Sequence, residues 1–590
     1  MKKTKEAKRI LAAALAAAML VGLSACQNDQ TTSSNSVSQT GGVSSGQAEE
    51  NTVSTDPVTL TIFSMQGTST TYGVEENWVF NDLKEKTGIS LDWQTAAGNA
   101  NDVMNTMLAG GELPDIVGFN GIEFAQQAMG GNWLLNLDDY QELMPNLFEE
   151  PLYQDMIDYS RKYYSTDNKL HLLATAVGVD STSDVNWLPQ LMYQPYKAAG
   201  SPKVTTLEDY LDVVEAMVAA RPTTENGEKV YGFTLFSDWD NYDASQAAGL
   251  SYFYGINCGN PFTELNMITQ EASSTLDDDS FYKRCLQFYF EANQRGLLDP
   301  DSMTQTFDMA TQKFSAGRVM FTYYSWMTGT YNDVSAGHVT PADGSEPDGF
   351  YAVLGEDMKF YDAPNKTIGN NKYYAADSHS EYPERCAQML DWLYSKDAQF
   401  LMLNGPEGLC WDTDEDGKFY ITEEGQTYLD DTKKELPGGG TFRCGLDRFN
   451  NVPLGEALVD PETEQSMCWR YWDSTLEKKP NDLKQIWRDN HEGAVNSYRY
   501  MTDKDMLAHA TQAVNMINPV TGDLQLTVSQ IGDKVKTYSW QMIYAKDQAE
   551  FDSIWEKMVS EAKALGLEEV NQYFYDQWEN ALEIAKDYDA

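Results

Sequence analysis

The sequence predicts an α/β protein with more than one domain, and three observations lead to that prediction. About 530 residues follow the N-terminal segment, too many for one hydrophobic core. Hydrophobic residues make up 42% and aromatic residues 12% of the 590 residues, enough to fill packed interiors. From residue 58 onward, apolar patterns of period two alternate with helical patterns, the order expected of a sheet covered by helices.

The first α/β region is predicted over residues 58–119. Its alternating strand has a clear period of two, and glycines follow both of its helical patterns. A β-α-β-α-β order is typical of parallel strands joined by crossover helices. The predicted elements, in chain order, lie at 58–63, 75–86, 89–93, about 101–109 and 116–119.

A second α/β region and a helical C-terminus follow. The apolar residues of these helices recur at spacings of three and four, and the strands read as short apolar runs. Trp555 and Trp578 lie on helical apolar stripes and are predicted to be core residues. The predicted helices lie at 206–220, 279–295, 383–395 and about 551–565 and 574–582, and the buried strands at 230–236 and 319–324.

The first 26 residues have the layout of a bacterial export signal. A basic segment precedes an apolar run at residues 10–22, which is too short for a membrane-spanning helix of about 20 residues. Leu23-Ser24-Ala25-Cys26 resembles the lipobox of bacterial lipoproteins. That resemblance implies a signal peptide at 1–25 and fatty acyl chains such as palmitate on Cys26. The alternative is a secreted protein cleaved near Ala25 without lipid.

Residues 26–57 are predicted to be a flexible tether behind the lipidated cysteine. They are rich in Ser, Thr, Gly, Asn and Gln and have almost no apolar residues. Such a segment cannot bury enough apolar surface to offset the entropy of ordering. No later segment has the apolar length of a membrane helix, so the lipid would be the only membrane attachment.

The charge balance excludes one class of partner. The chain carries 90 acidic and 42 basic residues, for a net charge of −48. Such a charge repels nucleic acids and anionic lipid head groups, and no basic stripe offsets it. We therefore expect no nucleic-acid partner.

Six cysteines remain besides Cys26, and their state is open. None forms a C-x-x-C pair, and their wide spacing fits no zinc motif. An exported protein can form disulfides, but several of these cysteines lie in apolar patterns typical of buried thiols. They are Cys258, Cys285, Cys386, Cys410, Cys444 and Cys468.

Several segments resemble the extracellular solute-binding proteins of bacterial ABC sugar importers, in particular the long lipoprotein members that bind oligosaccharides. Gly111 to Asp115 is similar to a G-x-x-P-D motif, and residues 313–320 resemble an F-x-x-G-[KR]-x-A-M stretch, with Val319 in place of the alanine. Residues 391–395 and 405–411 resemble a helix end and a G-x-E-G-x-x-[WY] segment. The resemblance covers nearly all of the chain after the tether.

The resemblance implies a two-lobe, periplasmic-binding-protein-like α/β fold with a hinge and a ligand cleft between the lobes. By that resemblance, the first lobe spans residues 58–180 and 375–435. The second lobe then spans 181–374 and 436–590. Residues 436–545 match no motif of the family, and their place in the second lobe is an expectation.

Tryptophans in polar, loop-like contexts are the candidate ligand-binding residues. Sugars present apolar C–H faces, which aromatic rings stack on, and a rim of hydroxyls for polar side chains. Trp326 follows the 313–320 motif where the family has a sugar-stacking aromatic, and Trp411 closes the 405–411 motif. The other candidates come from local context, and for each of them a core position is the alternative. They are Trp187, Trp239 and Trp472.

Polar candidates lie after two predicted strands of the first region. Asn120 follows the strand at 116–119, and Gln66 and Thr68 follow the strand at 58–63. These positions suit donors and acceptors at the hydroxyl rim of a sugar, and capping of an ordinary loop is the alternative.

One segment has the spacing of a calcium loop. Asp412, Asp414, Asp416, Gly417 and Glu423 fit D-x-D-x-D-G-x5-E. Glycine and proline residues just before the segment exclude an entering helix, so it is no true EF-hand. The alternative is an acidic hairpin turn between two short strands. If calcium binds, it is expected to brace a loop and to take no part in catalysis.

No catalytic motif is present, so no catalytic residue and no required cofactor are predicted. The five histidines form no close pair, and neither the P-loop pattern nor the G-x-G-x-x-G pattern of phosphate-binding loops appears.

The leading hypothesis is a monomeric binding protein on the extracellular face of the cell membrane, which delivers an oligosaccharide to an ABC transporter permease. Two alternatives remain open: a surface-anchored glycoside hydrolase, whose carboxylate pair needs only spatial proximity, and a binding protein for peptides or another solute.

Overall fold

Two large hydrophobic cores organise the chain, and each is built around its own sheet. The computed structural model describes residues 54–67, 72–95, 99–179, 187–362, 365–450, 452–476 and 480–589. The export signal, Cys26, most of the tether and Thr68 lie outside these residues. Within them, no helix is both long and apolar enough to cross a membrane.

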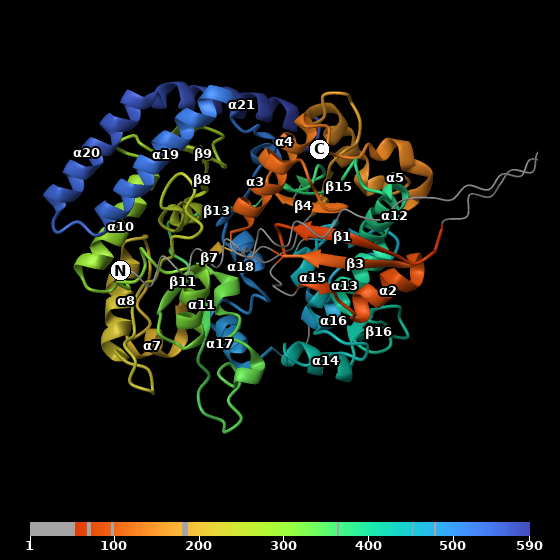
Figure 1. Ribbon diagram of the computed structural model, residues 1–590. Helices are drawn as coiled ribbons and strands as arrows, with labels where there is room; N and C mark the ends of the chain where they lie inside the picture. Colours follow the sequence, from red (N-terminus) through yellow and green to blue (C-terminus); the bar gives the residue numbers. More distant parts are fainter. Residues whose placement is uncertain are drawn as a thin grey trace, which may run out of the picture. The chain divides into compact units, whose positions relative to one another are not determined.

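The first core surrounds a six-stranded sheet with the strand order β2-β3-β1-β4-β15-β5. Strands β1, β3, β4 and β15 of this sheet are labelled in Figure 1. Strands β3 and β4 pair in parallel with β1, while β15 pairs antiparallel to β4. The strands are β1 (Val58–Ser64), β2 (Gly73–Val74), β3 (Ile89–Gln94), β4 (Ile116–Asn120), β5 (Leu173–Ala174) and β15 (Lys372–Ala376).

The predicted β-α-β-α-β order is present in this sheet. Helix α2 (Trp78–Thr87) joins β1 to β3 and ends at Gly88, whose φ of 75° is the left-handed conformation that glycine adopts without strain. Helix α3 (Ala100–Gly110) joins β3 to β4. The remaining helices of this part are α4 (Ile122–Gly130), α5 (Pro145–Phe148), α6 (Gln154–Tyr159), α12 (Pro383–Tyr394), α13 (Lys396–Asn404), α14 (Glu423–Asp430), α15 (Cys444–Phe449) and α16 (Asp473–Leu476).

The second core surrounds a three-stranded antiparallel sheet, β11-β7-β12. Its strands are β7 (Trp187–Met192), β11 (Phe321–Tyr324) and β12 (Phe350–Ala352). The strand predicted at 230–236 is reduced to isolated bridges, Tyr231 with Val319 and Phe233 with Leu298. The backbone of this segment lies very close to its neighbours. A Cβ atom at Gly232 would lie 2.6 Å from a methyl group of Val214, so only glycine fits at this position without a shift.

Helices cover this second sheet, and three of them form the C-terminal part of the chain (Figure 1). Both α19 and α20 pack in the second core, where Trp555 is buried, and Trp578 on α21 is buried as predicted. The helices are α7 (Tyr193–Ala198), α8 (Asp209–Ala220), α9 (Ser245–Ala248), α10 (Phe281–Gln294), α11 (Phe307–Ser315), α17 (Asp482–Asn490), α18 (Ser497–Asp503), α19 (Gly522–Ile543), α20 (Gln548–Leu565) and α21 (Leu567–Ala585).

The chain passes between the two cores three times. The first core runs from Leu60 to Val177 and from Tyr373 to Trp472, and the second holds Leu188 to Phe360 and Tyr498 to Phe574. Two of the crossing segments pair through β6 (Gly178–Val179) and β14 (Asn365–Lys366). A smaller core with Tyr159, Leu265 and Trp578 joins residues from both parts.

One predicted boundary is wrong. Residues 436–472 were expected in the second lobe, but their apolar side chains, from Leu436 to Trp472, are buried in the first core. The reason is visible at α15: its Phe449 ring packs edge-on against Trp93 of β3, at 5.3 Å between ring centroids. A contact between residues so far apart in the sequence leaves no local signal.

Smaller strand pairs complete the fold. One three-stranded sheet and three two-stranded pairs lie outside the two main sheets and the β6–β14 pair. Their strands are β8 (Ile256–Asn260), β9 (Thr263–Asn266), β10 (Ala272–Ser274), β13 (Phe360–Asp362), β16 (Trp411–Thr413), β17 (Phe419–Ile421), β18 (Val459–Asp460), β19 (Gln465–Ser466) and β20 (Leu507–His509).

All six described cysteines are buried with free thiols. Burial in apolar surroundings raises the pKa of these thiols, for example to about 12 for Cys386 and Cys468. Of the two alternatives left open by the sequence, the buried-thiol alternative holds.

Candidate functional site

A cavity of about 1010 Å³ lies among residues of both cores and of the segments that cross between them. The second core contributes β7, β12 and the turn η5 (Ser325–Thr328), and the first contributes residues between Gly455 and Leu476. The crossing segments contribute Tyr361 and Asn370, and α17 contributes Trp487. This is the size of site that takes a ligand larger than a single small metabolite.

Aromatic rings are abundant in the lining of this cavity. Flat apolar rings of this kind fit the C–H face of a sugar ring, and their polar edges suit a wet site. In the described part of the chain, nine aromatic residues line the cavity: Trp187, Tyr252, Phe350, Tyr351, Phe360, Tyr361, Trp469, Tyr471 and Trp487.

Trp187 is the one sequence-predicted site residue in the lining. It begins β7 and is half-buried against other rings, with centroids 4.4 Å from Tyr252 and 5.1 Å from Tyr324. Ring contacts on several sides fix the indole before any ligand arrives, which reduces the entropy that binding must remove.

The polar part of the lining is amide-rich and carries few carboxylates. Amides supply both donors and acceptors, as sugar hydroxyls require. Among the described residues of the lining, three are basic and two acidic, whereas acids outnumber bases 90 to 42 in the whole chain. Arg470 and Glu456 form an ion pair of 2.7 Å within it. The polar lining residues include Gln190, Asn332, Asn370, Asn481, Asn496, Lys366 and Lys484.

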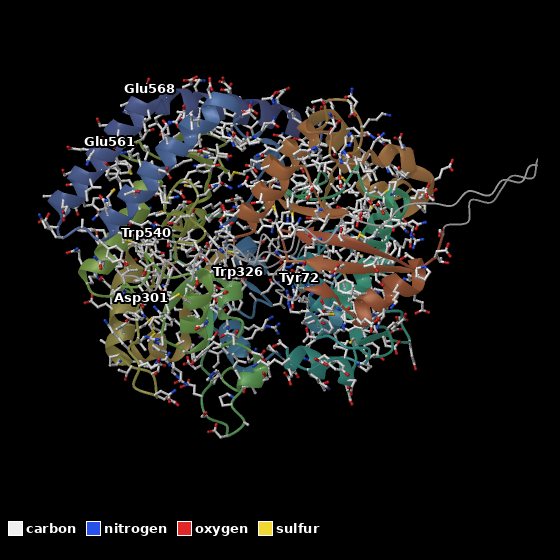
Figure 2. The ribbon with its side chains drawn as sticks, in the orientation of Figure 1. Tyr72, Asp301, Trp326, Trp540, Glu561 and Glu568 are labelled. Carbon is white, nitrogen blue, oxygen red and sulfur yellow. The ribbon has the colours of Figure 1, made fainter. Side chains whose placement is uncertain are left out.

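Trp326 and Trp239 lie on the second core but outside the lining. Trp326, on η5, is labelled in Figure 2. It is 42% exposed, and its ring centroid lies 6.0 Å from that of Trp187. Trp239, in the loop after Ser237, is 45% exposed and stacks on Phe307 at 4.5 Å. The structure therefore brings Trp187 and Trp326 together and places Trp239 next along the same surface.

Trp411 and Trp472 are core residues, so the prediction that they bind ligand is wrong for this structure. Trp472 is 1% and Trp411 9% exposed, and both pack in the first core with Phe400 and Phe419. Their indole N–H groups donate to backbone carbonyls, Trp411 to Gly405 at 3.0 Å and Trp472 to Ser466 at 2.8 Å. Neither ring has a face open to a ligand.

Gln66 and Asn120 lie at the end of the first sheet. Gln66 is buried, and its amide nitrogen donates to the carbonyls of Phe119 at 2.9 Å and Tyr373 at 3.2 Å, so it joins three strand ends. Asn120 is exposed at the end of β4, where it pairs with Lys372. Neither residue lines the cavity.

The acidic segment at 412–423 forms a hairpin. Strands β16 and β17 pair antiparallel, and the Asp414 carboxylate accepts hydrogen bonds from the backbone N–H groups of Asp416 at 3.0 Å and Lys418 at 2.8 Å. Gly417, with φ 79°, closes the turn and Glu423 begins α14. Within the residues described, no three side chains of metal-binding type are arranged to hold an ion. Calcium binding at this segment stays a prediction from the sequence.

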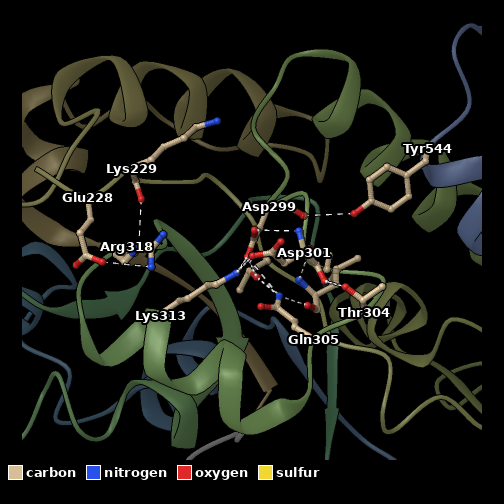
Figure 3. A network of polar contacts seen from close by, with 12 residues as sticks. Glu228, Lys229, Asp299, Asp301, Thr304, Gln305, Lys313, Arg318 and Tyr544 are labelled. Atoms are coloured by element: carbon tan, nitrogen blue, oxygen red, sulfur yellow. Dashed lines mark hydrogen bonds and ion pairs between the residues drawn. The ribbon is translucent and has the colours of Figure 1, made fainter. Parts of the chain in front are cut away.

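The 313–320 motif is anchored by a buried polar network (Figure 3). The Lys313 ammonium lies 2.6 Å from the buried carboxylate of Asp299 and 2.9 Å from that of Asp301. Gln305 donates to Asp299 and to the Thr234 hydroxyl, and Arg318 donates to the Lys229 carbonyl at 3.3 Å. The motif therefore has a structural role: it fixes the chain that leads into β11 and η5.

Two half-buried carboxyl groups near Trp239 have raised pKa values. Burial raises the pKa of Asp240 to about 7 and that of Asp243 to about 6. Asp240 accepts from the Trp540 indole at 2.6 Å, and Asp243 accepts from the Ser245 hydroxyl at 2.7 Å. Because neither lines the cavity, they do not form the facing pair that glycoside hydrolysis uses.

Sequence reasoning missed most of the first core's contribution to the cavity. In the run from Trp469 to Trp472, it selected Trp472, whereas Trp469 and Tyr471 line the cavity. Trp469 to Tyr471 form the 3-10 turn η7 (Trp469–Tyr471). Trp472, which follows it, packs on Phe400 and Phe419, and this contact leaves the other side of the turn exposed. Trp487 has no motif around it, and no sequence signal marks it.

Several solved structures are similar in fold. The alginate-binding protein AlgQ2, in a structure without calcium ion, is 16% identical over 90% of this chain and 100% of that chain, with a TM-score of 0.57. FusA of Streptococcus pneumoniae, an ABC-transporter substrate-binding protein in complex with kestose, is 17% identical over 89% and 100%, with a TM-score of 0.55. An HMO-binding, ABC-transporter-associated protein of Bifidobacterium longum infantis is 16% identical over 89% and 99%, with a TM-score of 0.51.

These similarities confirm the predicted two-lobe, periplasmic-binding-protein-like fold. No curated protein matches the sequence. The family model for bacterial extracellular solute-binding proteins matches residues 66–400, more than half of the 590 residues. The chain therefore belongs to the family of bacterial extracellular solute-binding proteins.

Proposed function

We propose that this chain captures an oligosaccharide in the cavity and delivers it to the permease of an ABC transporter, anchored to the membrane by lipid on Cys26. The observation that carries the proposal is the cavity itself: about 1010 Å³, with nine aromatic rings and an amide-rich polar lining. Rings and amides together match the apolar faces and hydroxyl rims of sugars.

The crossing segments support a hinge mechanism. The cavity is lined from both cores, and three chain segments pass between those cores. A ligand that contacts both sides stabilises the arrangement in which they approach, because it binds that arrangement more tightly than the open one. A permease that recognises only the closed arrangement would then accept loaded protein.

A binding role without catalysis fits the carboxylates of the lining. Glu456 is held in an ion pair with Arg470, and Asp362 is the other acid of the described lining. A retaining or inverting glycosidase needs two acids facing one bond, one of them with a raised pKa. The Glu456 carboxylate is already engaged by the Arg470 guanidinium, at 2.7 Å.

Ligand-dependent melting tests the proposal. Residues 54–590, which form one compact unit, are melted alone and with neutral and acidic oligosaccharides and short peptides. A ligand at 100 times its dissociation constant adds about 2.7 kcal/mol of stability. A shift with a sugar recovered intact supports the receptor. A shift with a cleaved sugar indicates a hydrolase, and a shift with peptides alone replaces the sugar in the proposal.

Two variants separate the cavity from the rest of the surface. Trp187→Ala removes a lining ring and is expected to abolish most of the shift. Tyr382→Ala removes an exposed ring outside the lining and is expected to leave the shift unchanged. If the ligand raised the melting temperature of both variants equally, the ligand would bind outside the cavity.

The anchor is tested in whole cells. Cys26→Ser removes the only thiol that the lipobox-like sequence offers for acylation, so the protein is expected to leave the membrane fraction and appear in the medium. Uptake of the bound sugar should fall in the same cells. Retention of Cys26→Ser protein in the membrane fraction would contradict lipid anchoring there.

A further inference from the structure

Of the fourteen tryptophans in the chain, two are strongly exposed, and both contact the same tyrosine. Trp239 is 45% and Trp326 42% exposed, whereas the other twelve are buried or half-buried. The Tyr324 ring lies 4.6 Å from that of Trp326 and 6.2 Å from that of Trp239, between centroids. Large exposed aromatic patches are rare on soluble proteins and mark binding surfaces.

We call Trp239, Phe307, Tyr324 and Trp326 the aromatic shelf; Tyr324 is buried and lies between the two exposed indoles. Trp239 and Phe307 stack with centroids 4.5 Å apart and planes 18° apart, so they form one flat double ring at its outer end. At the inner end, Trp326 contacts Trp187 of the cavity at 6.0 Å. Ser325 and Thr328, on either side of Trp326, also line the cavity. The shelf therefore begins where the cavity lining ends.

The outer end of the shelf is held in place by its backbone. The Asp238 carboxylate accepts from the backbone N–H of Phe307 at 2.9 Å, which ties the two stacked residues together. On the other side of Trp239, the Asp240 carboxylate accepts from the Trp540 indole of α19 at 2.6 Å and from the backbone N–H of Ser245 at 3.0 Å. A surface fixed before binding loses little entropy on contact with a ligand.

We propose that the outer pair, Trp239 on Phe307, is an additional sugar-binding subsite that takes the units of an oligosaccharide extending out of the cavity. The proposal rests on the function proposed above and adds to it a preference for long ligands. The exposed indole face of Trp239 stacks on the C–H face of a sugar ring, and the Asp238 carboxylate beside it accepts from hydroxyls at the ring's edge. Affinity then rises with ligand length beyond the number of units that fill the cavity.

Graded oligosaccharides test this inference. Malto-, cello-, xylo- and fructo-oligosaccharides of two to seven units are titrated into residues 54–590 by calorimetry. The series that binds is repeated with Trp239→Ala, Trp239→Phe and the control Tyr382→Ala. Trp239→Ala should bind the shortest ligands as the parent does and the longest on the order of tenfold more weakly, the effect of about 1.4 kcal/mol of apolar burial.

The control variants distinguish stacking from general damage. Trp239→Phe keeps a ring on Phe307 and should recover most of the affinity for long ligands, while Tyr382→Ala should match the parent throughout. A loss that is equal for short and long ligands, or no loss at any length, would overturn the subsite. Unchanged sugar affinity with lost uptake in cells would assign the shelf to a protein partner and also overturn it. Failure of every series to bind would reject the oligosaccharide function itself.

Discussion

Replacing Lys313 with methionine is the sharpest test of the structure of the second core. The Lys313 ammonium lies 2.6 Å from the Asp299 carboxylate, which is fully buried (Figure 3). Methionine keeps the length and apolar stem of the side chain and removes only the charge. The Asp299 carboxylate then keeps hydrogen bonds from the Thr234 hydroxyl and the Gln305 amide but has lost its buried counter-ion.

The expected loss follows from that uncompensated charge. Removing one partner of a buried ion pair destabilises a protein by about 3–5 kcal/mol, whereas replacing both partners with neutral groups is often close to neutral. Lys313→Met alone should therefore lower the free energy of unfolding by about 3–5 kcal/mol. The double variant Lys313→Met with Asp299→Asn should regain a large part of that loss, since no buried charge remains.

Urea unfolding at neutral pH measures these free energies. Asp301→Asn is the matched control, because Asp301 contacts the same ammonium at 2.9 Å from an exposed position, where an ion pair contributes about 0–1 kcal/mol. A Lys313→Met loss no larger than that of Asp301→Asn would refute the reasoning. So would a double variant less stable than Lys313→Met.

Three further predictions concern pH, the misassigned tryptophan and calcium. Folding raises the pKa of the Asp240 carboxyl to about 7, because burial disfavours its charged form. The folded state therefore holds the proton more tightly than the unfolded state, and this contribution to stability is lost as pH rises from about 4 through 7. The free energy of unfolding should therefore be higher at pH 5.5 than at pH 7.5, and Asp240→Asn should reduce the difference by on the order of 1 kcal/mol; an unchanged difference would contradict the burial of that carboxyl. Trp472→Ala should lower the free energy of unfolding by about 3–5 kcal/mol, because it empties a core position, and leave sugar affinity in calorimetry unchanged; lost affinity in a folded variant would return Trp472 to the site. Calcium binding at residues 412–423 stays a prediction from the sequence: it requires a melting temperature raised by millimolar Ca²⁺ and an effect that Glu423→Gln abolishes, and no shift would leave the segment a hairpin turn.

Local patterns predicted the elements of the first sheet well. Strand β1 begins at Val58, as the alternation indicated, and α2 ends at Gly88, where the sequence placed its stop. The buried positions of Trp555 and Trp578 followed from helical spacing. These features depend on residues within a few positions of one another, so a single sequence contains the information.

The sequence predicted an aromatic-lined site, but it did not identify most of the residues that line the cavity. Aromatic side chains do line the cavity, yet Trp187 is the predicted one among them. Trp472 and Trp469 stand three residues apart in one turn, and packing on Phe400 buries the first while the second faces the cavity. Which side of a short turn is buried depends on partners distant in the sequence.

The α/β class, the helix and strand ends near glycines, the strong negative charge and the export signal pattern can all be read from the sequence, because each depends on composition or on neighbouring residues. Three other features became known from the three-dimensional contacts: residues 436–472 pack on the first sheet, the described cysteines are buried thiols, and certain tryptophans lie at the cavity. Those outcomes depend on contacts such as Phe449 on Trp93, where burial of apolar surface joins residues that the chain order separates.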